Sequence, residues 1–243
     1  LMICDSCDDV KIEAENVNFL LSKKVDGIIA LPVSTKTDSL RAAKKAGVPV
    51  VLIDRSSEDG AFDCVRIDNR RAAYRAVRFL LENGHREIGI VCSHTEYTGE
   101  ERYRGYEDAM REANCELRQE YCAAGTHSIE FGFEGMSRLL SLKERPAAVF
   151  MTNYALALGA VMALNKTKLH GPGDIALMGF DDLIMSHVIH PRLHMVVQPM
   201  KEMGERAAEL LLERIGSKER EMAMEIVLGT RISEGDSVAV MMN

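Results

Sequence analysis

The sequence predicts an α/β protein of two lobes, in which each lobe is a parallel, doubly wound sheet flanked by helices. Short apolar runs alternate with amphipathic helical segments over most of the chain, and this alternation is typical of parallel sheets rather than of sandwiches or bundles. The chain has 243 residues, of which 47% are hydrophobic, so its composition is that of an ordinary globular protein. The strands are too numerous for one small sheet, and we therefore expect two lobes.

The first part of the chain carries the usual signals for the ends of helices and strands. Asp8 or Asp9 can cap a first helix, Thr35 or Thr37 can cap a second, and Gly47 can end that second helix. Residues 1–4 have the apolar character of the middle of a strand, so we expect the natural N-terminus to lie further upstream. The expected strands here are residues 1–4, 25–31, 48–53 and 64–67, and the expected helices are residues 9–24 and 35–47.

The second part of the chain continues the same alternation. Asp68 or Asn69 can start a helix that ends at Gly84, and Asn153 can cap an Ala- and Leu-rich helix. Pro199 stands at a position tolerated in the first turn of a helix. The expected strands are residues 88–92, 117–123, 147–151, 174–178, 193–197, 222–228 and 237–241, and the expected helices are residues 69–83, 99–113, 129–142, 153–165 and 199–215.

We expect the chain to cross from one lobe to the other more than once. The short strand at residues 64–67 and the segment near residues 193–200 are the expected crossings. This places residues 1–67 and 199–228 in an N-terminal lobe, and residues 68–198 and 229–243 in a C-terminal lobe.

The overall chemistry of the chain argues against several classes of function. The net charge is −7 and no basic cluster is present, so the chain is a poor nucleic-acid binder by itself. Six cysteines are scattered without metal-ligand spacing apart from one Cys4-x-x-Cys7 pair, and no apolar run is long enough to cross a membrane. No motif of hydrolases, kinases or dinucleotide enzymes is present. We therefore expect no enzyme activity, no cofactor and no metal.

Polar residues follow almost every expected strand. Ligands of open parallel sheets bind beyond the carboxyl ends of the strands, and this mixture of carboxylates, amides, imidazoles and a guanidinium suits a neutral polyhydroxylated ligand such as a sugar or nucleoside. The alternative is that these residues cap helices or belong to ordinary polar loops. The residues are Asp54 with Arg55, His94 with Thr98, Thr126 with His127, Asn153 with Tyr154, Asp181 with Asp182, and Gln198.

Six segments, in order along the chain, resemble the effector-binding domain of LacI/GalR-type transcriptional regulators. This resemblance covers nearly the whole chain and implies a periplasmic-binding-protein-like fold with an effector in a cleft between the lobes. The segments are Val25-Asp-Gly-Ile-Ile29, Gly47-Val-Pro-Val-Val51 with Asp54-Arg55, Asn83-Gly-His-Arg-Glu-Ile-Gly-Ile90, Arg102-Tyr-Arg-Gly-Tyr106, Met178-Gly-Phe-Asp-Asp182, and His190-Pro-Arg-Leu193 with Gln198-Pro199.

The resemblance implies a role for each candidate effector-binding residue. Arg102 would reach the ligand with its guanidinium, Thr98 lies one turn earlier, and Asp181 would accept hydrogen bonds from hydroxyl or amine groups. The remaining implied contacts are Asp54 and Arg55 from the other lobe, His127 at a position that is often aromatic, Asn153, and Gln198 at a lobe crossing. Asp182 keeps a helix-capping role.

The sequence departs from the family pattern in two places. Tyr154 stands where the family commonly has Asp, and Glu96 stands where some members have a basic contact, which disfavours an anionic effector. The family's helix-turn-helix and the first strand and helix of its N-terminal lobe would precede Leu1, so the resemblance implies operator binding for a longer protein.

Three functions follow as hypotheses. The first is the effector-sensing and dimerising part of a cytoplasmic transcriptional repressor, with a small-molecule effector, a DNA operator and a second copy of itself as partners, and with no membrane partner. The alternative is a periplasmic sugar-binding protein of an ABC transporter, and an enzyme acting on a sugar is a third reading. The sequence upstream separates the first two, since one requires a helix-turn-helix and the other a signal peptide.

Overall fold

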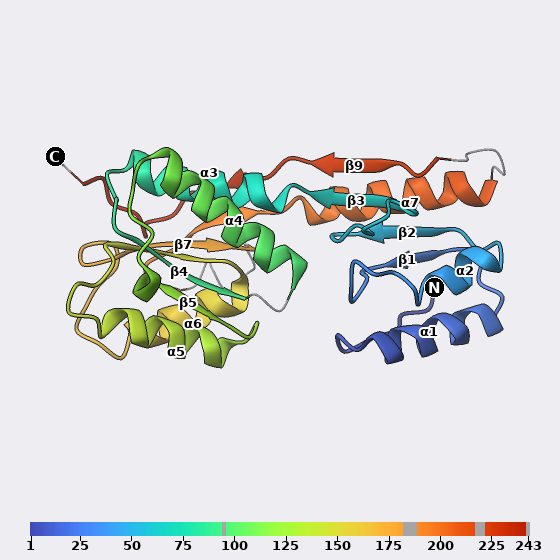
Figure 1. The fold of residues 1–243 in the computed structure, drawn as a ribbon, viewed down its shortest axis with the longest axis horizontal. Helices are drawn as coiled ribbons and strands as arrows, with labels where there is room; N and C mark the ends of the chain where they lie inside the picture. Colours follow the sequence, from blue (N-terminus) through green and yellow to red (C-terminus); the bar gives the residue numbers. More distant parts are fainter. Residues whose placement is uncertain (94–95, 182–188, 217–221, 242–243) are drawn as a thin grey trace. The chain divides into compact units, whose positions relative to one another are not determined.

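The protein divides into two compact units in a computed structural model that describes residues 1–93, 96–181, 189–216 and 222–241. Unit 1 comprises residues 1–67 and 199–229, and unit 2 comprises residues 68–198 and 230–243. The chain passes between the units after Ile67, after Gln198 and after Gly229. The fold class expected from the sequence is confirmed, because both units contain mostly parallel sheets flanked by helices (Figure 1).

Unit 1 is built on a parallel sheet with the strand order β1-β2-β3-β9. The helices α1 and α2 pack against one face through Val17, Leu40 and Ala43, whereas α7 contacts the strands from the other face. The strands are β1 (Ile28–Ala30), β2 (Val50–Ile53), β3 (Asp63–Ile67) and β9 (Glu225–Leu228), and the helices are α1 (Val10–Ser22), α2 (Arg41–Lys45) and α7 (Met200–Gly216).

An ion pair connects α7 to the sheet of unit 1. Arg214 donates from Nε and Nη2 to the two carboxylate oxygens of Asp63, each at 2.6 Å, and Asp63 also accepts from the Met224 backbone N–H at 2.7 Å. The Asp63 side chain is only 5% exposed. A buried carboxylate requires such complete pairing, so this contact fixes the end of α7 next to the strand that follows it.

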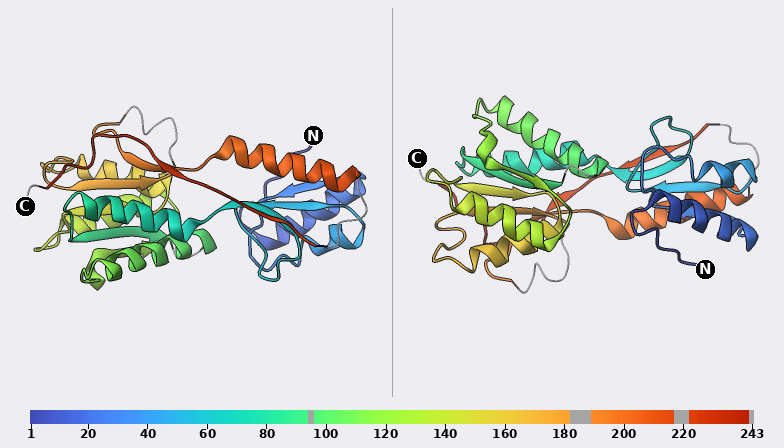
Figure 2. Two further views of the ribbon diagram at one scale, coloured as in Figure 1. Left: turned by 90° about the horizontal axis from the view of Figure 1, so that it is seen from above. Right: turned by 60° about the horizontal axis from the view of Figure 1, so that its bottom comes forward.

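Unit 2 is built on a larger sheet with the order β10-β8-β7-β6-β4-β5, in which only β10 is antiparallel to its neighbour. The helices α3 and α4 pair on one face and α5 and α6 pair on the other, as Figures 1 and 2 show. The strands are β4 (Ile88–Ser93), β5 (Cys122–Gly125), β6 (Ala148–Met151), β7 (Ala176–Phe180), β8 (His194–Val197) and β10 (Arg231–Ile232). The helices are α3 (Asn69–Glu82), α4 (Tyr97–Glu112), α5 (Ile129–Leu140) and α6 (Tyr154–Leu164), with a 3₁₀ turn at Gln119–Tyr121.

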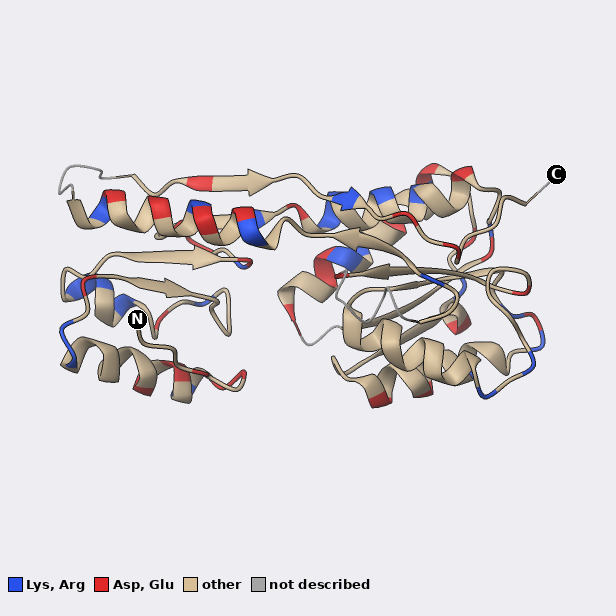
Figure 3. Ribbon diagram, turned by 180° about the vertical axis from the view of Figure 1, so that it is seen from behind, with Lys and Arg blue, Asp and Glu red and all other residues tan. Residues whose placement is uncertain are grey.

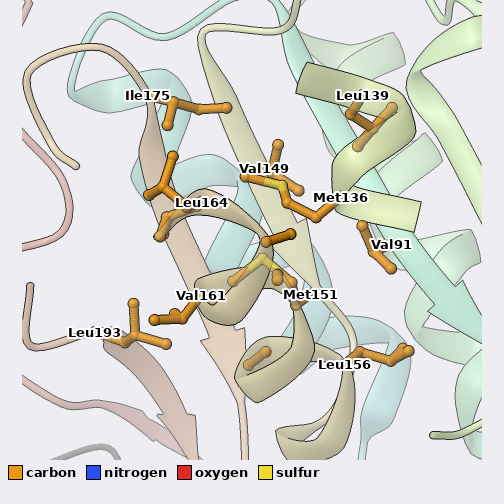
Figure 4. Packing of buried hydrophobic residues seen from close by; sticks show 14 of the residues in the cluster. Val91, Met136, Leu139, Val149, Met151, Leu156, Val161, Leu164, Ile175 and Leu193 are labelled. Carbon is orange, nitrogen blue, oxygen red and sulfur yellow. The ribbon is translucent and has the colours of Figure 1, made fainter. Parts of the chain in front are cut away.

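One core cluster of unit 2 lies between its sheet and the pair α5 and α6. Val91 of β4 and Val149 of β6 lie close to Met136 and Leu156 (Figure 4), and Leu177 of β7 belongs to the same cluster. Charged residues are sparse on α5 and absent from α6, whereas α7 of unit 1 carries both signs along its length (Figure 3). The charge pattern follows burial, because α6 is covered on nearly every side.

The helix caps expected from the sequence are largely confirmed. Asp9, Asp68 and Asn153 each accept a hydrogen bond from a backbone N–H in the first turn of the helix that follows. The cap expected at Thr35 or Thr37 is wrong, because α2 begins only at Arg41 after Leu40. The role expected for Asp182 lies outside the described residues.

Three expected strands differ from the structure. Residues 1–4 are exposed and form no strand, and residues 237–241 form none either. Instead, hydrogen bonds outside any strand pairing attach the C-terminal segment to unit 2: Ser237 exchanges hydrogen bonds with the Leu177 backbone, and the Met241 N–H donates to the Asn83 carbonyl. The strand expected at 117–123 is displaced to Cys122–Gly125, because residues 119–121 form a 3₁₀ turn.

Candidate functional site

The strands of unit 2 bring six of the eight predicted site residues to one edge of a sheet. Because β4 to β8 are parallel, their carboxyl ends all lie at the same edge. Asn153 follows β6, Asp181 follows β7 and Gln198 follows β8, while Thr98 and Arg102 lie on α4 and His127 lies beyond β5.

Arg102 is the most buried cation of this edge. Its relative exposure is 5%, and its Nη1 donates to Asp181 Oδ2 at 3.1 Å and to the Thr152 carbonyl at 2.7 Å. Its Nε donates to Asn69 Oδ1 at 2.8 Å, and the guanidinium carbon lies 3.6 Å from the centre of the Phe180 ring. A guanidinium held by three acceptors and an aromatic face cannot turn freely, so Arg102 is a rigid element of the site.

Asp181 is held in a strained backbone conformation. Its φ angle is +69°, in the left-handed region that Asp adopts only occasionally. Its Oδ1 accepts from Gln198 Nε2 at 2.6 Å, while Oδ2 accepts from Arg102. The side chain remains 24% exposed. Strain that the surroundings maintain is characteristic of functional positions, and here it presents an oriented carboxylate with part of its surface open.

A second polar pair stands beside this group. His127 Nδ1 and Glu96 Oε1 are 3.1 Å apart, with side-chain exposures of 43% and 17%. The hydrogen bond that His127 donates to the Glu96 carboxylate raises the pKa of His127, and the charge of Asp181 adds to this effect while burial and Arg102 oppose it. The pair therefore gains a positive charge as the pH falls, and it can donate and accept hydrogen bonds at the same time.

Thr98 and Asn153 are more buried than a ligand-contacting role alone requires. Their relative exposures are 5% and 4%. Asn153 Oδ1 accepts from the Leu156 N–H at 2.9 Å and caps α6. For Asn153 the capping interpretation is confirmed, and ligand contact stays a prediction. His94, which we grouped with Thr98, lies outside the described residues.

Sequence reasoning did not assign Asn69, Thr152 and Phe180 to the site. They surround Arg102 through a side-chain oxygen, a backbone carbonyl and a ring face, respectively. Asn69 was considered only as a helix start. The hydroxyl of Thr152 is buried without a hydrogen-bond partner in the described part of the chain, and no local sequence signal indicates that position.

Asp54 and Arg55 belong to unit 1, where they follow β2 at the carboxyl edge of that sheet. Asp54 also has a positive φ angle, +70°, and its N–H donates to the Val65 carbonyl at 2.9 Å. Arg55 Nη1 donates to the Pro32 carbonyl at 3.3 Å, and Arg55 Nε lies 3.9 Å from Asp54 Oδ2. Each unit thus places a left-handed aspartate directly after a parallel strand.

A hollow of about 730 Å³ lies at the opposite edge of the unit 1 sheet, away from Asp54 and Arg55. Its walls come from the beginnings of the strands, at Pro49, Val50 and Phe62, and from the ion-paired Asp63 and Arg214. It contains none of the predicted site residues. The volume of this hollow therefore does not identify the functional site, and the candidate site is the group of polar side chains at the carboxyl edge of the unit 2 sheet.

The described residues also bear on metals and membranes. Within residues 1–93, 96–181, 189–216 and 222–241, no three His, Cys, Asp or Glu side chains are grouped as metal ligands would be. No helix in that same part of the chain is both long and apolar enough to cross a membrane.

Comparisons with known proteins connect this arrangement to a family. Residues 77–238 match the model of a periplasmic binding protein-like domain. The chain is 33% identical over 216 residues to the helix-turn-helix transcriptional repressor PurR of Actinobacillus pleuropneumoniae, which corresponds to 88% of the chain and 64% of that repressor. It is 35% identical over 243 residues to PurR of Serratia proteamaculans, which corresponds to 98% of the chain and 71% of the relative.

A solved structure agrees with these relatives. The LacI family transcriptional regulator of Enterococcus faecium with bound ribose superposes with a TM-score of 0.87 at 28% identity, over 99% of this chain and 88% of that chain. The chain spans 64% of the length of the first of the repressors named above.

Proposed function

Because this chain belongs to the LacI/GalR-type family of transcriptional regulators, as an effector-binding domain of periplasmic-binding-protein-like fold, we propose that it senses a small polar effector for a DNA-binding repressor. Members of this family are regulators and not enzymes. The proposal concerns the effector, the residues that hold it and the longer protein in which the domain acts.

The observation that carries the proposal is the fixed carboxylate of Asp181. Arg102 and Gln198 each occupy one of its oxygens, the backbone is strained, and a quarter of the side chain is open. An ionised carboxylate whose orientation is set in advance accepts hydrogen bonds from hydroxyl or N–H groups strongly and directionally. Asp181 is therefore the proposed anchor of the effector.

The remaining proposed contacts favour a neutral, hydroxyl-rich or nucleoside-like effector. Glu96 and Asp181 make the edge acidic, which disfavours a phosphate or carboxylate ligand. Ribose bound to the related Enterococcus faecium regulator supports a sugar or a sugar-containing ligand. The proposed effector-binding residues are Thr98, Arg102, His127, Asn153, Asp181 and Gln198 of unit 2, with Asp54 and Arg55 of unit 1 as further contacts.

A thermal-shift screen of sugars, nucleobases and nucleosides tests the effector proposal. A ligand at one hundred times its Kd stabilises the native state by about 2.7 kcal/mol, which is a shift of roughly 5–10 °C for a protein of this size. Asp181→Asn keeps a residue type that tolerates positive φ, and we expect it to abolish the shift. Glu134→Gln removes an exposed charge from α5 and serves as the matched control.

If no compound in a broad panel stabilises the wild-type chain, the sensor proposal fails. If Asp181→Asn responds as the wild type does, the effector binds elsewhere. Wild type and Asp181→Asn are compared in the same thermal-shift measurement. A destabilised variant is therefore recognised by a melting temperature without ligand that is lower than that of the wild type.

We further propose that the complete regulator binds DNA in the cytoplasm as a dimer through a helix-turn-helix outside this chain. The relatives that this chain resembles are named as helix-turn-helix repressors, and dimeric repressors read two half-sites through their two-fold symmetry. An effector would act by shifting the population of two conformations. Sedimentation of the complete protein, together with a gel shift on its own upstream DNA with and without effector, tests this. A monomer with no shifted band would contradict it.

A further inference from the structure

Three segments carry the chain from one unit to the other, and two of them are connected through the candidate site. The first crossing follows Ile67, the second follows Gln198 and the third follows Gly229. Asn69 lies directly after the first crossing, and Gln198 is the last residue of unit 2 before the second. The side chains of both residues belong to the hydrogen bonds of the candidate site.

The connection is a continuous series of side-chain hydrogen bonds. Arg102 Nε donates to Asn69 Oδ1 at 2.8 Å, and Arg102 Nη1 donates to Asp181 Oδ2 at 3.1 Å. Gln198 Nε2 donates to the other carboxylate oxygen of Asp181 at 2.6 Å. Each of the three bonds includes an ionised group, and such bonds are roughly twice as strong as bonds between neutral groups. The series therefore joins the first crossing to the second through two charged side chains.

The central part of this series is shielded from water. Asn69 and Arg102 are almost fully buried, and the Phe180 ring covers the guanidinium of Arg102. Hydrogen bonds in such surroundings are electrostatically stronger than in water, and neighbouring bonds polarise one another. The planar guanidinium holds its acceptors in a fixed geometry, so Arg102 cannot move toward one partner without weakening its bond to the other. A displacement at one end of the series is therefore felt at the other end.

The third crossing is held by a different residue. Arg75, on the exposed side of α3, donates from Nη1 to the Thr230 carbonyl at 3.0 Å. This bond connects α3 to the segment that follows Gly229, and it uses neither the guanidinium of Arg102 nor the carboxylate of Asp181. The third crossing therefore serves as an internal reference for the other two.

We propose that the Arg102–Asp181 pair transmits occupancy of the effector site to the first two crossings, with Asn69 and Gln198 as the positioning residues at its two ends. This inference rests on the proposed sensing function for the identity of the input, whereas the hydrogen bonds exist without an effector. An effector that donates to Asp181 shares the two carboxylate oxygens with Gln198 and Arg102, and it therefore alters the strength of both bonds. Differential binding energy then acts on both crossings, as a ligand-driven shift between conformations requires.

Amide hydrogen exchange of the effector-free chain, read by mass spectrometry, tests the connection, because the exchange of a segment follows its local opening. Asn69→Leu removes the acceptor at the first crossing. We expect this variant to raise exchange by about five-fold in residues 66–70 and also in residues 196–201 at the second crossing, while residues 228–231 exchange as in the wild type. Asn69→Asp keeps an acceptor for Arg102 and should restore the wild-type pattern.

Two further variants examine the same series from other positions. Gln198→Leu removes the donor at the second crossing and should raise exchange in residues 66–70 as well as around itself. Arg75→Met is the matched control on α3 and should raise exchange in residues 228–231 only.

The pattern of exchange decides the outcome. An increase confined to the crossing that carries the substitution would overturn the proposal, because the two crossings would then open independently. An equal increase at all three crossings would overturn it as well, since general destabilisation would explain the result. The measurement uses no ligand, so its failure is distinct from a failure of the sensing function, which the thermal-shift screen detects.

Discussion

Replacing Arg102 with methionine removes the cation on which the carboxyl edge of unit 2 is built. Three acceptors lose a donor: Asn69 Oδ1, the Thr152 carbonyl and Asp181 Oδ2. Removing one partner of a buried ion pair costs about 3–5 kcal/mol. Asp181 is 24% exposed and keeps the Gln198 hydrogen bond, and a methionine sulfur still packs on Phe180, so we expect the low end, about 3 kcal/mol.

Urea denaturation followed by circular dichroism measures this loss as a change in midpoint at constant slope. Arg104→Met is the matched control, because Arg104 lies on the same helix and its half-exposed guanidinium pairs with the exposed Glu100 and the partly buried Glu101. Surface pairs are worth about 0–1 kcal/mol, so the control should remain near the wild type. Arg102→Lys should recover little, since an ammonium cannot reach the three acceptors in the fork geometry of a guanidinium.

A double-mutant cycle with Asp181→Asn isolates the ion pair. We expect a coupling energy of about 1–2 kcal/mol, within the range of about 0.5–3 kcal/mol for directly contacting residues. A loss below about 1 kcal/mol for Arg102→Met, or additive effects in the cycle, would refute the view of Arg102 as the rigid centre of the site. The expected instability also means that loss of ligand binding in an Arg102 variant has to be measured at a temperature where the variant is folded.

Three further predictions follow from local geometry. Gly105→Ala places a Cβ 2.1 Å from the Arg70 carbonyl at the contact of α3 and α4, so we expect a loss of about 1–3 kcal/mol in urea denaturation. The Cβ added by Gly204→Ala in α7 meets nothing within 4 Å, so this variant should gain up to about 1 kcal/mol of stability. Equal changes in stability for the two variants would contradict the close contact of α3 and α4 at Gly105. Asn153→Ala should cost about 1 kcal/mol through the lost cap of α6, and Asn153→Asp should restore most of it. Burial lowers the pKa of His85, whose Nε2 lies 2.9 Å from the Ala239 carbonyl. The contribution of neutral His85 to stability is therefore present above pH ~6.5 and is lost as the pH falls toward the folded-state pKa. His85→Gln should flatten the decline of urea midpoints between pH 7 and pH 5, and pH profiles of variant and wild type that run parallel would show that His85 is not responsible.

The elements of the fold were predictable where the signals are local. Apolar runs of four to six residues predicted strands such as β2, β4 and β6. Capping residues, together with the spacing of apolar residues, predicted helices such as α3 and α6. These signals depend on side-chain periodicity and on hydrogen bonds within one turn. They fail at residues 1–4 and 237–241, because an apolar run becomes a strand only when a partner strand satisfies its backbone groups.

The candidate site shows the same division between local and distant information. The sequence by itself indicated Asp181 and Gln198, because polar residues that follow buried parallel strands gather at one edge, whereas Arg102 was indicated only by the resemblance to the family. It also placed Asp54 and Asp181 at the ends of strands in different lobes. It could not indicate that both aspartates have left-handed backbones, since short-range sequence does not determine that strain.

Only the tertiary structure decided what surrounds Arg102. Asn69 begins a helix, Thr152 contributes a backbone carbonyl and Phe180 presents a ring face, and these three positions come from segments far apart in the chain. The same holds for the hydrogen bonds that connect Asn69 to Gln198 through Arg102. Composition and periodicity determine which residues are buried and where elements begin, whereas the partners of a buried charge depend on long-range packing that no local pattern encodes.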